Sequence, residues 1–130
     1  MVRMAVCLDT TFLVDLLAGD PAATAFSENL AEPVAVSAVS FYELLFGVKG
    51  SRRLARIEAI AQDYTVLPLD YDVCAMAAAI QGRLADEGKL IPVLDAMIAA
   101  SAILADVPIV TSDEHFSRIP HDFGLAVRTY

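Results

Sequence analysis

The sequence is poor in cysteine and has no long uninterrupted hydrophobic run. Its two cysteines, Cys7 and Cys74, lie far apart in apolar surroundings and lack metal-ligand spacing, which predicts reduced, buried thiols and argues against a disulfide or a zinc site. Charges or prolines break the apolar runs well before the roughly 20 residues that a membrane span requires. Asp9 and Asp15 interrupt the N-terminal segment where a signal peptide would be apolar, so we expect a cytoplasmic protein without a membrane segment.

Positive charge is also scarce, because 9 lysines and arginines stand against 17 aspartates and glutamates, giving a formal net charge of −8. This balance argues against a protein that binds nucleic acid over its whole surface. Four of the nine basic residues are concentrated in GVKGSRRLAR, namely Lys49, Arg52, Arg53 and Arg56. We call these four residues the basic segment. They could contact phosphates or an acidic partner, and a solvated helix face explains the same cluster.

Apolar residues are abundant: they make up 57% of the 130 residues, and the mean hydropathy is +0.57. A chain of this length can bury a core without disulfides or a structural metal, so we expect a single domain over residues 1–130. The apolar content exceeds what a 13.9 kDa domain readily buries. We therefore expect a homodimer that covers the excess apolar surface.

Short apolar segments alternate with segments of helical periodicity. Continuously apolar runs are typical of strands covered on both faces of a parallel sheet, and they predict strands at 4–8, 33–37, 64–69, 107–110 and 125–130. Apolar spacing and capping residues predict helices over 10–19, 21–30, 41–48, 52–62 and 71–88 and a helix that begins at Pro92. The alternation predicts an α/β fold in which a parallel sheet of four to five strands lies between two helical layers.

Four acidic residues stand where such a fold could bind a ligand. Asp9 follows the first predicted strand and Asp113 follows the fourth, and ligands gather beyond the carboxyl ends of parallel strands. Asp95 and Glu43 are each the only acid in an apolar helical segment, IPVLDAMIAASAIL and VSFYELLFGV. A favourable interaction with the helix start could explain Asp95 alone, and caps or turns could explain any one of the four.

Several carboxylates buried together are costly unless cations compensate their charge. A cluster of Asp and Glu without His or Cys favours a hard ion, Mg²⁺ or Mn²⁺, and argues against zinc. Such metal sites usually act on phosphates, because the ion generates hydroxide from a bound water and stabilises the leaving oxygen. These residues therefore favour a metal-dependent phosphodiesterase.

Hydroxyl residues lie beside the predicted acids. Thr10, Thr111 and Ser112 could orient the carboxylates, although turn hydroxyls often only cap their own backbone. His115 could donate a proton or contact phosphate, but a surface histidine in a loop is the simpler interpretation.

Two further acids have simpler explanations. Asp15 lies two turns into the first helix and is expected in solvent or at the rim of the site. Asp70 closes a strand, but the helix that follows makes it an N-cap.

Four segments resemble, in order, the motif blocks of PIN-domain ribonucleases, particularly the VapC-type toxins of prokaryotic toxin–antitoxin pairs. They are LDTTFLVDLL at 8–17, SAVSFYELLFG at 37–47, IPVLDAMIAASA at 91–102 and IVTSDEHFSRI at 109–119. Any one block is weakly specific, whereas four in the correct order, over essentially the whole chain, are strong evidence. By this resemblance, the four acids of the family's active site correspond to Asp9, Glu43, Asp95 and Asp113.

The resemblance implies a three-layer α/β/α fold and Mg²⁺- or Mn²⁺-dependent endonuclease activity on RNA. It also implies frequent homodimerisation and inhibition by a small VapB-like antitoxin that binds DNA, so the basic segment becomes a candidate contact for RNA or antitoxin. One position departs from the family, which often carries Asn where this chain has Thr11. Thr11 can hydrogen-bond a water or phosphate but cannot donate as an amide does, which bears on efficiency more than on reaction type.

Three other classes of protein share part of this pattern. A haloacid-dehalogenase-type phosphatase requires a second acid at the position of Thr11. A receiver domain with Asp70 as phosphate acceptor requires a lysine after the last strands, but Lys49 and Lys89 lie elsewhere. A PIN-like protein that only binds RNA or a partner stays open, although it would not require all four acids.

Overall fold

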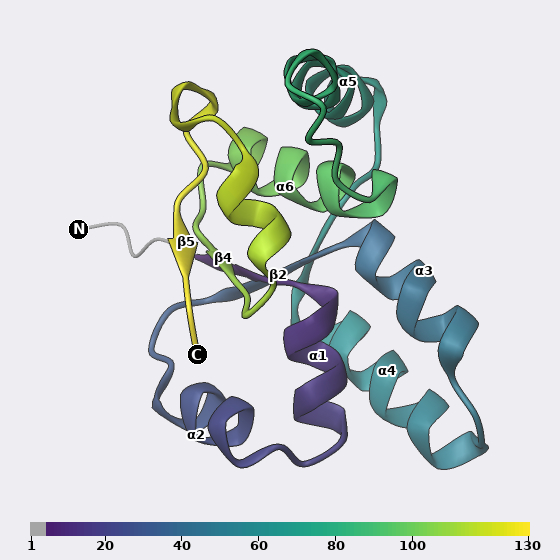
Figure 1. The fold of residues 1–130 in the computed structure, drawn as a ribbon. Coiled ribbons are helices and arrows are strands. Elements are labelled where there is room, and N and C mark those ends of the chain that lie inside the picture. The colour runs from purple at the N-terminus through teal and green to yellow at the C-terminus, as the bar shows by residue number, and fades with distance from the viewer. Residues whose placement is uncertain (1–4) are drawn as a thin grey trace.

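The computed structural model describes residues 5–130, whose centre is a five-stranded, entirely parallel sheet (Figure 1). The strand order is β3-β2-β1-β4-β5. The strands are β1 (Val6–Leu8), β2 (Val34–Ser37), β3 (Thr65–Leu67), β4 (Ile109–Val110) and β5 (Val127–Arg128). Each lies within a predicted strand, and Met4, which the prediction included, lies outside the described residues. The predicted α/β fold is confirmed.

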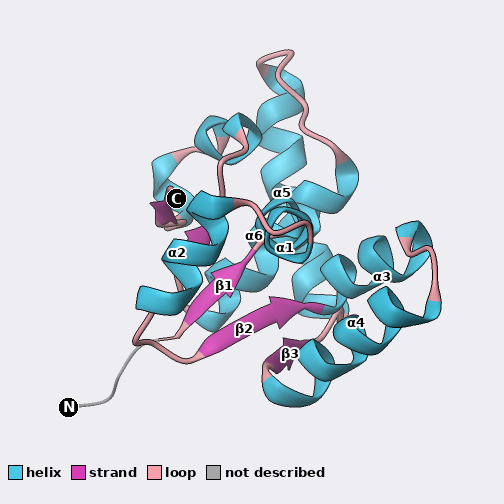
Figure 2. Ribbon diagram, turned by 90° about the horizontal axis from the view of Figure 1, so that it is seen from below, coloured by secondary structure: helices cyan, strands magenta, loops and turns pink. Residues whose placement is uncertain are grey.

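Helices cover both faces of this sheet (Figures 1 and 2). They are α1 (Thr10–Leu17), α2 (Pro21–Asn29), α3 (Ala38–Gly47), α4 (Ser51–Asp63), α5 (Tyr71–Asp86) and α6 (Val93–Ala105), followed by the 3₁₀ turns η1 (Glu114–Arg118) and η2 (His121–Phe123). No helix among the described residues is long and apolar enough to cross a membrane.

Two hydrophobic cores lie against the two faces of the sheet, and successive residues of β1 divide between them. Cys7 packs in a core built mainly from α5, α6 and η1. Its neighbours Val6 and Leu8 pack in the other core, with residues of α1, α3 and α4. This alternation of side chains along a strand produces the three layers.

Caps fix where several helices begin, and three of them, α3, α4 and α6, begin at a residue other than the predicted one. Asp70 caps α5 by accepting from the backbone N–H of Val73, as predicted. The N-cap of α4 is Gly50, whose φ of 92° favours glycine, and the helix begins one residue before the predicted range. Pro92 is the N-cap of α6 instead of its first residue. One cysteine prediction is also wrong, because Cys74 is exposed.

Candidate functional site

The four predicted acids line one open cavity of about 370 Å³ beside the carboxyl ends of β1 and β4. They reach it from four segments: Asp9 lies between β1 and α1, Glu43 on α3, Asp95 in the first turn of α6, and Asp113 between β4 and η1. Thr10, Thr11, Val14, Pro92 and Ile98 complete the lining. The fold therefore brings together four carboxylates that are spread over residues 9–113 of the sequence.

Asp9 is the most buried acid of the cavity, with 1% of its surface exposed. Its Oδ1 accepts from the backbone N–H of Phe12 at 2.8 Å, which caps α1, and its Oδ2 accepts from the Thr111 hydroxyl. Burial raises the pKa of Asp9 to about 6, and the nearby charges of Asp113 and Asp95 contribute to the rise. The two hydrogen bonds, from Thr111 and from the backbone of Phe12, lower the pKa. A cation beside Asp9 would oppose that shift.

Thr111 joins two of the acids. Its buried hydroxyl donates to Asp9 and accepts from the backbone N–H of Asp113 at 2.9 Å. The adjacent Ser112 behaves differently, because it is exposed and donates to the hydroxyl of Tyr130 at 3.2 Å. Of these two predicted orienting residues, only Thr111 contacts an acid of the cavity through a described hydrogen bond.

Thr10 orients the acid on α3. Its Oγ1 lies 2.7 Å from Glu43 Oε1 and 3.0 Å from Ser40 Oγ. The hydroxyl has one proton and an ionised carboxylate can only accept, so Thr10 donates to Glu43 and Ser40 donates to Thr10. Thr11 is exposed at the cavity wall.

His115 contacts two of the acids, contrary to the prediction of a surface loop histidine. Its Nδ1 lies 2.9 Å from Asp95 Oδ2 and 3.1 Å from Asp113 Oδ1. Burial raises the pKa of Asp95, with Asp113 adding to the shift and His115 opposing it. Ligand atoms of all three residues lie within 4.8 Å of one another, so they could share a metal ion.

Comparison with known proteins agrees with this geometry, since residues 6–122 match the PIN domain family. The chain belongs to the PIN domain family. Ribonuclease VapC19 of Mycobacterium tuberculosis is 32% identical over 117 residues, which cover 87% of this PIN domain chain and 93% of that protein. The family predicted from the four sequence segments is confirmed.

Solved structures share the fold. The DNA-bound VapBC structure from Salmonella typhimurium aligns over 97% of this PIN domain chain and 98% of that chain, with a TM-score of 0.82 and 26% identity. VapBC2 from Rickettsia felis, bound to a promoter DNA fragment, aligns over 98% and 99% of the two chains with a TM-score of 0.84 and 21% identity.

A divalent cation fits the donor set of this PIN domain. Four carboxylates line the cavity, and the buried Asp9 carries a raised pKa that a bound cation would lower. Oxygen donors suit Mg²⁺ and Mn²⁺, and no cysteine lines the cavity. The imidazole of His115 adds a nitrogen donor that the sequence prediction did not include.

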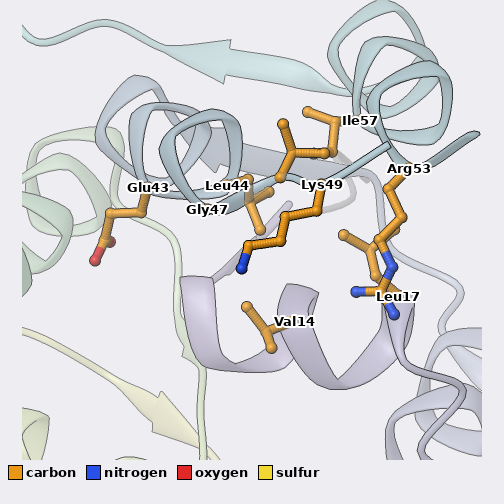
Figure 3. A pocket seen from close by; sticks show the side chains of 9 residues that line it. Val14, Leu17, Glu43, Leu44, Gly47, Lys49, Arg53 and Ile57 are labelled. Atoms are coloured by element: carbon orange, nitrogen blue, oxygen red, sulfur yellow. The ribbon is translucent and has the colours of Figure 1, made fainter. Parts of the chain in front are cut away.

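A second groove, of about 330 Å³, adjoins the acidic cavity between α1, α3 and α4 (Figure 3). Val14 and Glu43 line both spaces. The side chains of Lys49 and Arg53 extend along this groove over Leu17 and Val14 of α1, while Glu43 lies at its other end (Figure 3). Apolar and basic surface therefore runs directly up to the acids.

The basic segment divides into three kinds of residue. Lys49 and Arg53 line the groove. Arg56 donates to the Leu17 carbonyl at 2.9 Å and so ties α4 to α1. Arg52 is exposed and does not line this groove.

Two residues complete the surroundings of the site. Asp15 accepts a hydrogen bond from Tyr130, whose ring packs edge-on against Phe12 at 4.7 Å between centroids. Burial and the bond to Asp15 raise the pKa of Tyr130 to about 12. No motif in the sequence predicts these contacts of Tyr130. Asp70 lines a different cavity, so the acceptor that a receiver domain would use is outside the acidic cluster.

Proposed function

We propose that this PIN domain is a metal-dependent endoribonuclease of the VapC type that hydrolyses phosphodiester bonds in RNA. The observation that carries the proposal is the convergence of Asp9, Glu43, Asp95 and Asp113 on one cavity. Membership of the PIN domain family and the similarity to a protein named as a ribonuclease support it.

In this proposal the four acids are catalytic and hold Mg²⁺ or Mn²⁺. When bound, the metal supplies an activated water and stabilises charge on the phosphate oxygens. The protein's own contribution is to hold the carboxylates in place: Thr111 fixes Asp9 and the backbone of Asp113, and Thr10 fixes Glu43. Thr11, on the cavity wall, is positioned to hydrogen-bond a water or a phosphate.

We propose that Lys49 and Arg53 contact RNA or an antitoxin. The groove they line combines apolar residues with positive charge beside the acids, which suits either an RNA backbone or an amphipathic protein segment. VapBC-5 from Mycobacterium tuberculosis, which is 28% identical, is named as a member of the VapBC family of toxin–antitoxin systems, and this supports a small VapB-like antitoxin as partner.

We also propose a homodimer. Several large apolar residues near the start of α5 and on α3 are exposed, including Phe46 at 82% and Tyr71 at 83%. A mostly apolar cavity of about 210 Å³, lined by Tyr42 and Leu69 among others, lies beside them. A second copy would bury surface that water now contacts.

We further propose that residues 1–130 act as one domain in the cytoplasm. Both hydrophobic cores share the single sheet, which supports one folding unit. The free thiols of Cys7 and Cys74 suit a reducing compartment.

RNA cleavage under controlled metal conditions tests the proposed function. The purified protein should cut single-stranded RNA with Mg²⁺ or Mn²⁺ and lose this activity with EDTA, while Asp9→Asn should be inactive under every condition. The alternative of a binding-only PIN domain predicts RNA binding without metal-dependent cleavage. Cleavage by Asp9→Asn at the wild-type rate would contradict the proposal and point to a contaminating nuclease.

A further inference from the structure

His115 is held against two acids of the cavity, Asp95 and Asp113, at two points. Its backbone N–H donates to Asp113 Oδ1 at 2.9 Å, which fixes the start of η1. Its ring Nδ1 then lies between Asp95 Oδ2 and Asp113 Oδ1, at 2.9 Å and 3.1 Å. The imidazole therefore joins α6 to η1 at the place where their carboxylates meet.

These separations match those of neighbouring donors around one ion. Adjacent ligands of an octahedral metal lie roughly 3 Å apart when each metal–ligand distance is about 2.1 Å. A hydrogen-bonded imidazole has the same separations. The two roles are therefore distinguished by nitrogen coordination, because only a ligand bonds the ion through nitrogen.

We propose that His115 supplies its Nδ1 to the metal together with Asp95 and Asp113, and that this nitrogen makes the site prefer Mn²⁺ over Mg²⁺. The inference rests on the proposed function, which requires a divalent ion in this cavity. Mg²⁺ favours an all-oxygen shell, whereas imidazole suits transition metals, so replacing one oxygen donor by nitrogen penalises Mg²⁺ more. His115 thus becomes a specificity-determining residue for the metal.

The chain offers a direct substitution and a matched control. His115→Asn replaces the ring nitrogen by an amide that can offer oxygen, so it should keep Mg²⁺ binding while removing the nitrogen ligand. His121, the second histidine, is exposed on η2 and is not part of the group formed by Asp95, Asp113 and His115. His121→Asn is therefore the control for losing a histidine elsewhere.

Electron paramagnetic resonance of bound Mn²⁺ measures both affinity and coordination. We expect ¹⁴N coupling to the bound Mn²⁺ in the wild type and in His121→Asn. When the wild type is labelled with ¹⁵N in its histidines alone, ¹⁵N coupling should replace the ¹⁴N coupling. In His115→Asn the nitrogen coupling should be lost. Mn²⁺ affinity should fall roughly tenfold or more in His115→Asn, and Mg²⁺ affinity, measured by competition, should fall much less.

Each contrary outcome has a separate meaning. Bound Mn²⁺ without histidine nitrogen coupling in the wild type would overturn the inference and leave the proposed function standing, and this test requires no variant to fold. Equal losses of Mn²⁺ and Mg²⁺ affinity in His115→Asn would overturn the proposed selectivity. A wild-type protein that binds neither ion would overturn both the inference and the metal-dependent function.

Discussion

The hydroxyl of Thr111 donates to the carboxylate of Asp9 across 102 residues of sequence, and it does so inside the protein. The same oxygen accepts from the backbone N–H of Asp113. One threonine directly after β4 thus holds the carboxylate of Asp9 and the backbone of Asp113, two acids of the proposed metal site. In an empty site these carboxylates repel each other, so Thr111 stabilises an arrangement that a cation would otherwise have to impose.

Removing this hydroxyl should cost both stability and activity. Thr111→Val keeps the side-chain shape and leaves the buried Asp9 without one of its two donors, which should lower the free energy of unfolding by about 1.5–3 kcal/mol near pH 8. Thr111→Ser keeps the hydroxyl and is the matched control. Urea unfolding and RNA cleavage should place Thr111→Ser near the wild type and Thr111→Val well below it. Equal behaviour of the two variants would show that the hydrogen bond is unimportant.

Stability of the metal-free protein should depend on the ionisation of Asp9. Its pKa rises from 3.8 to about 6 on folding, so the folded state favours the protonated acid. The resulting stabilisation is complete below about pH 4 and is lost as the pH rises through 6. A displacement of this size corresponds to roughly 3 kcal/mol.

Asp9→Asn isolates that contribution because the amide does not titrate. Urea unfolding in EDTA between pH 4 and pH 8 should show the wild type losing stability relative to Asp9→Asn as the pH rises. A difference between the two proteins that stays constant over this range would contradict the raised pKa. Mn²⁺ should also raise the wild-type melting temperature more at pH 7.5 than at pH 5, because the metal binds the ionised carboxylate.

The sheet and the four acids could be predicted from the sequence, but the hydrogen bonds that hold the acids in place could not. Asp9 and Asp113 were recognisable because each follows a continuously apolar strand, and Asp95 and Glu43 because each is a lone acid in an apolar helix. The partner of Thr111 depends on β4 pairing with β1, which no local pattern encodes. The prediction for His115 is wrong for a similar reason, because its contact with Asp95 depends on how η1 packs against α6.

The basic segment should separate into binding and structural residues. Lys49→Ala and Arg53→Ala should weaken RNA binding and reduce its salt dependence, because each removes a charge that lines the groove. Arg52→Ala, exposed outside that groove, is the matched control and should change both less. Arg56→Ala should chiefly lower stability, since Arg56 bonds to the Leu17 carbonyl. Fluorescence anisotropy over a salt series measures the RNA affinity and its salt dependence. Equal losses of RNA affinity in Arg52→Ala and Arg53→Ala would show that the groove is not the RNA-binding surface.

The proposed dimer should depend on the exposed apolar residues of α3. Light scattering at micromolar concentration should give the dimer mass for the wild type. Phe46→Glu should shift it toward the monomer, because Phe46 is 82% exposed and a charge there would be costly to bury only in the dimer. Leu104→Glu alters another exposed apolar residue, on α6, and should leave the mass unchanged. A monomeric wild type would contradict the proposal.

Replacing Asp95 while following metal binding and RNA cleavage together tests the metal site most directly. Asp95→Asn keeps the shape of the side chain but removes the charge that balances an ion, and Asp72→Asn is a matched control because Asp72 is an exposed acid in the first turn of α5. We predict that Mn²⁺ raises the melting temperature of the wild type and of Asp72→Asn but has little effect on Asp95→Asn. RNA cleavage by Asp95→Asn should fall by roughly a hundredfold or more, while its metal-free stability is kept or improved because repulsion among the carboxylates decreases. An Asp95→Asn protein that still cleaves RNA at the wild-type rate and still gains stability from Mn²⁺ would contradict a metal site built on these four acids.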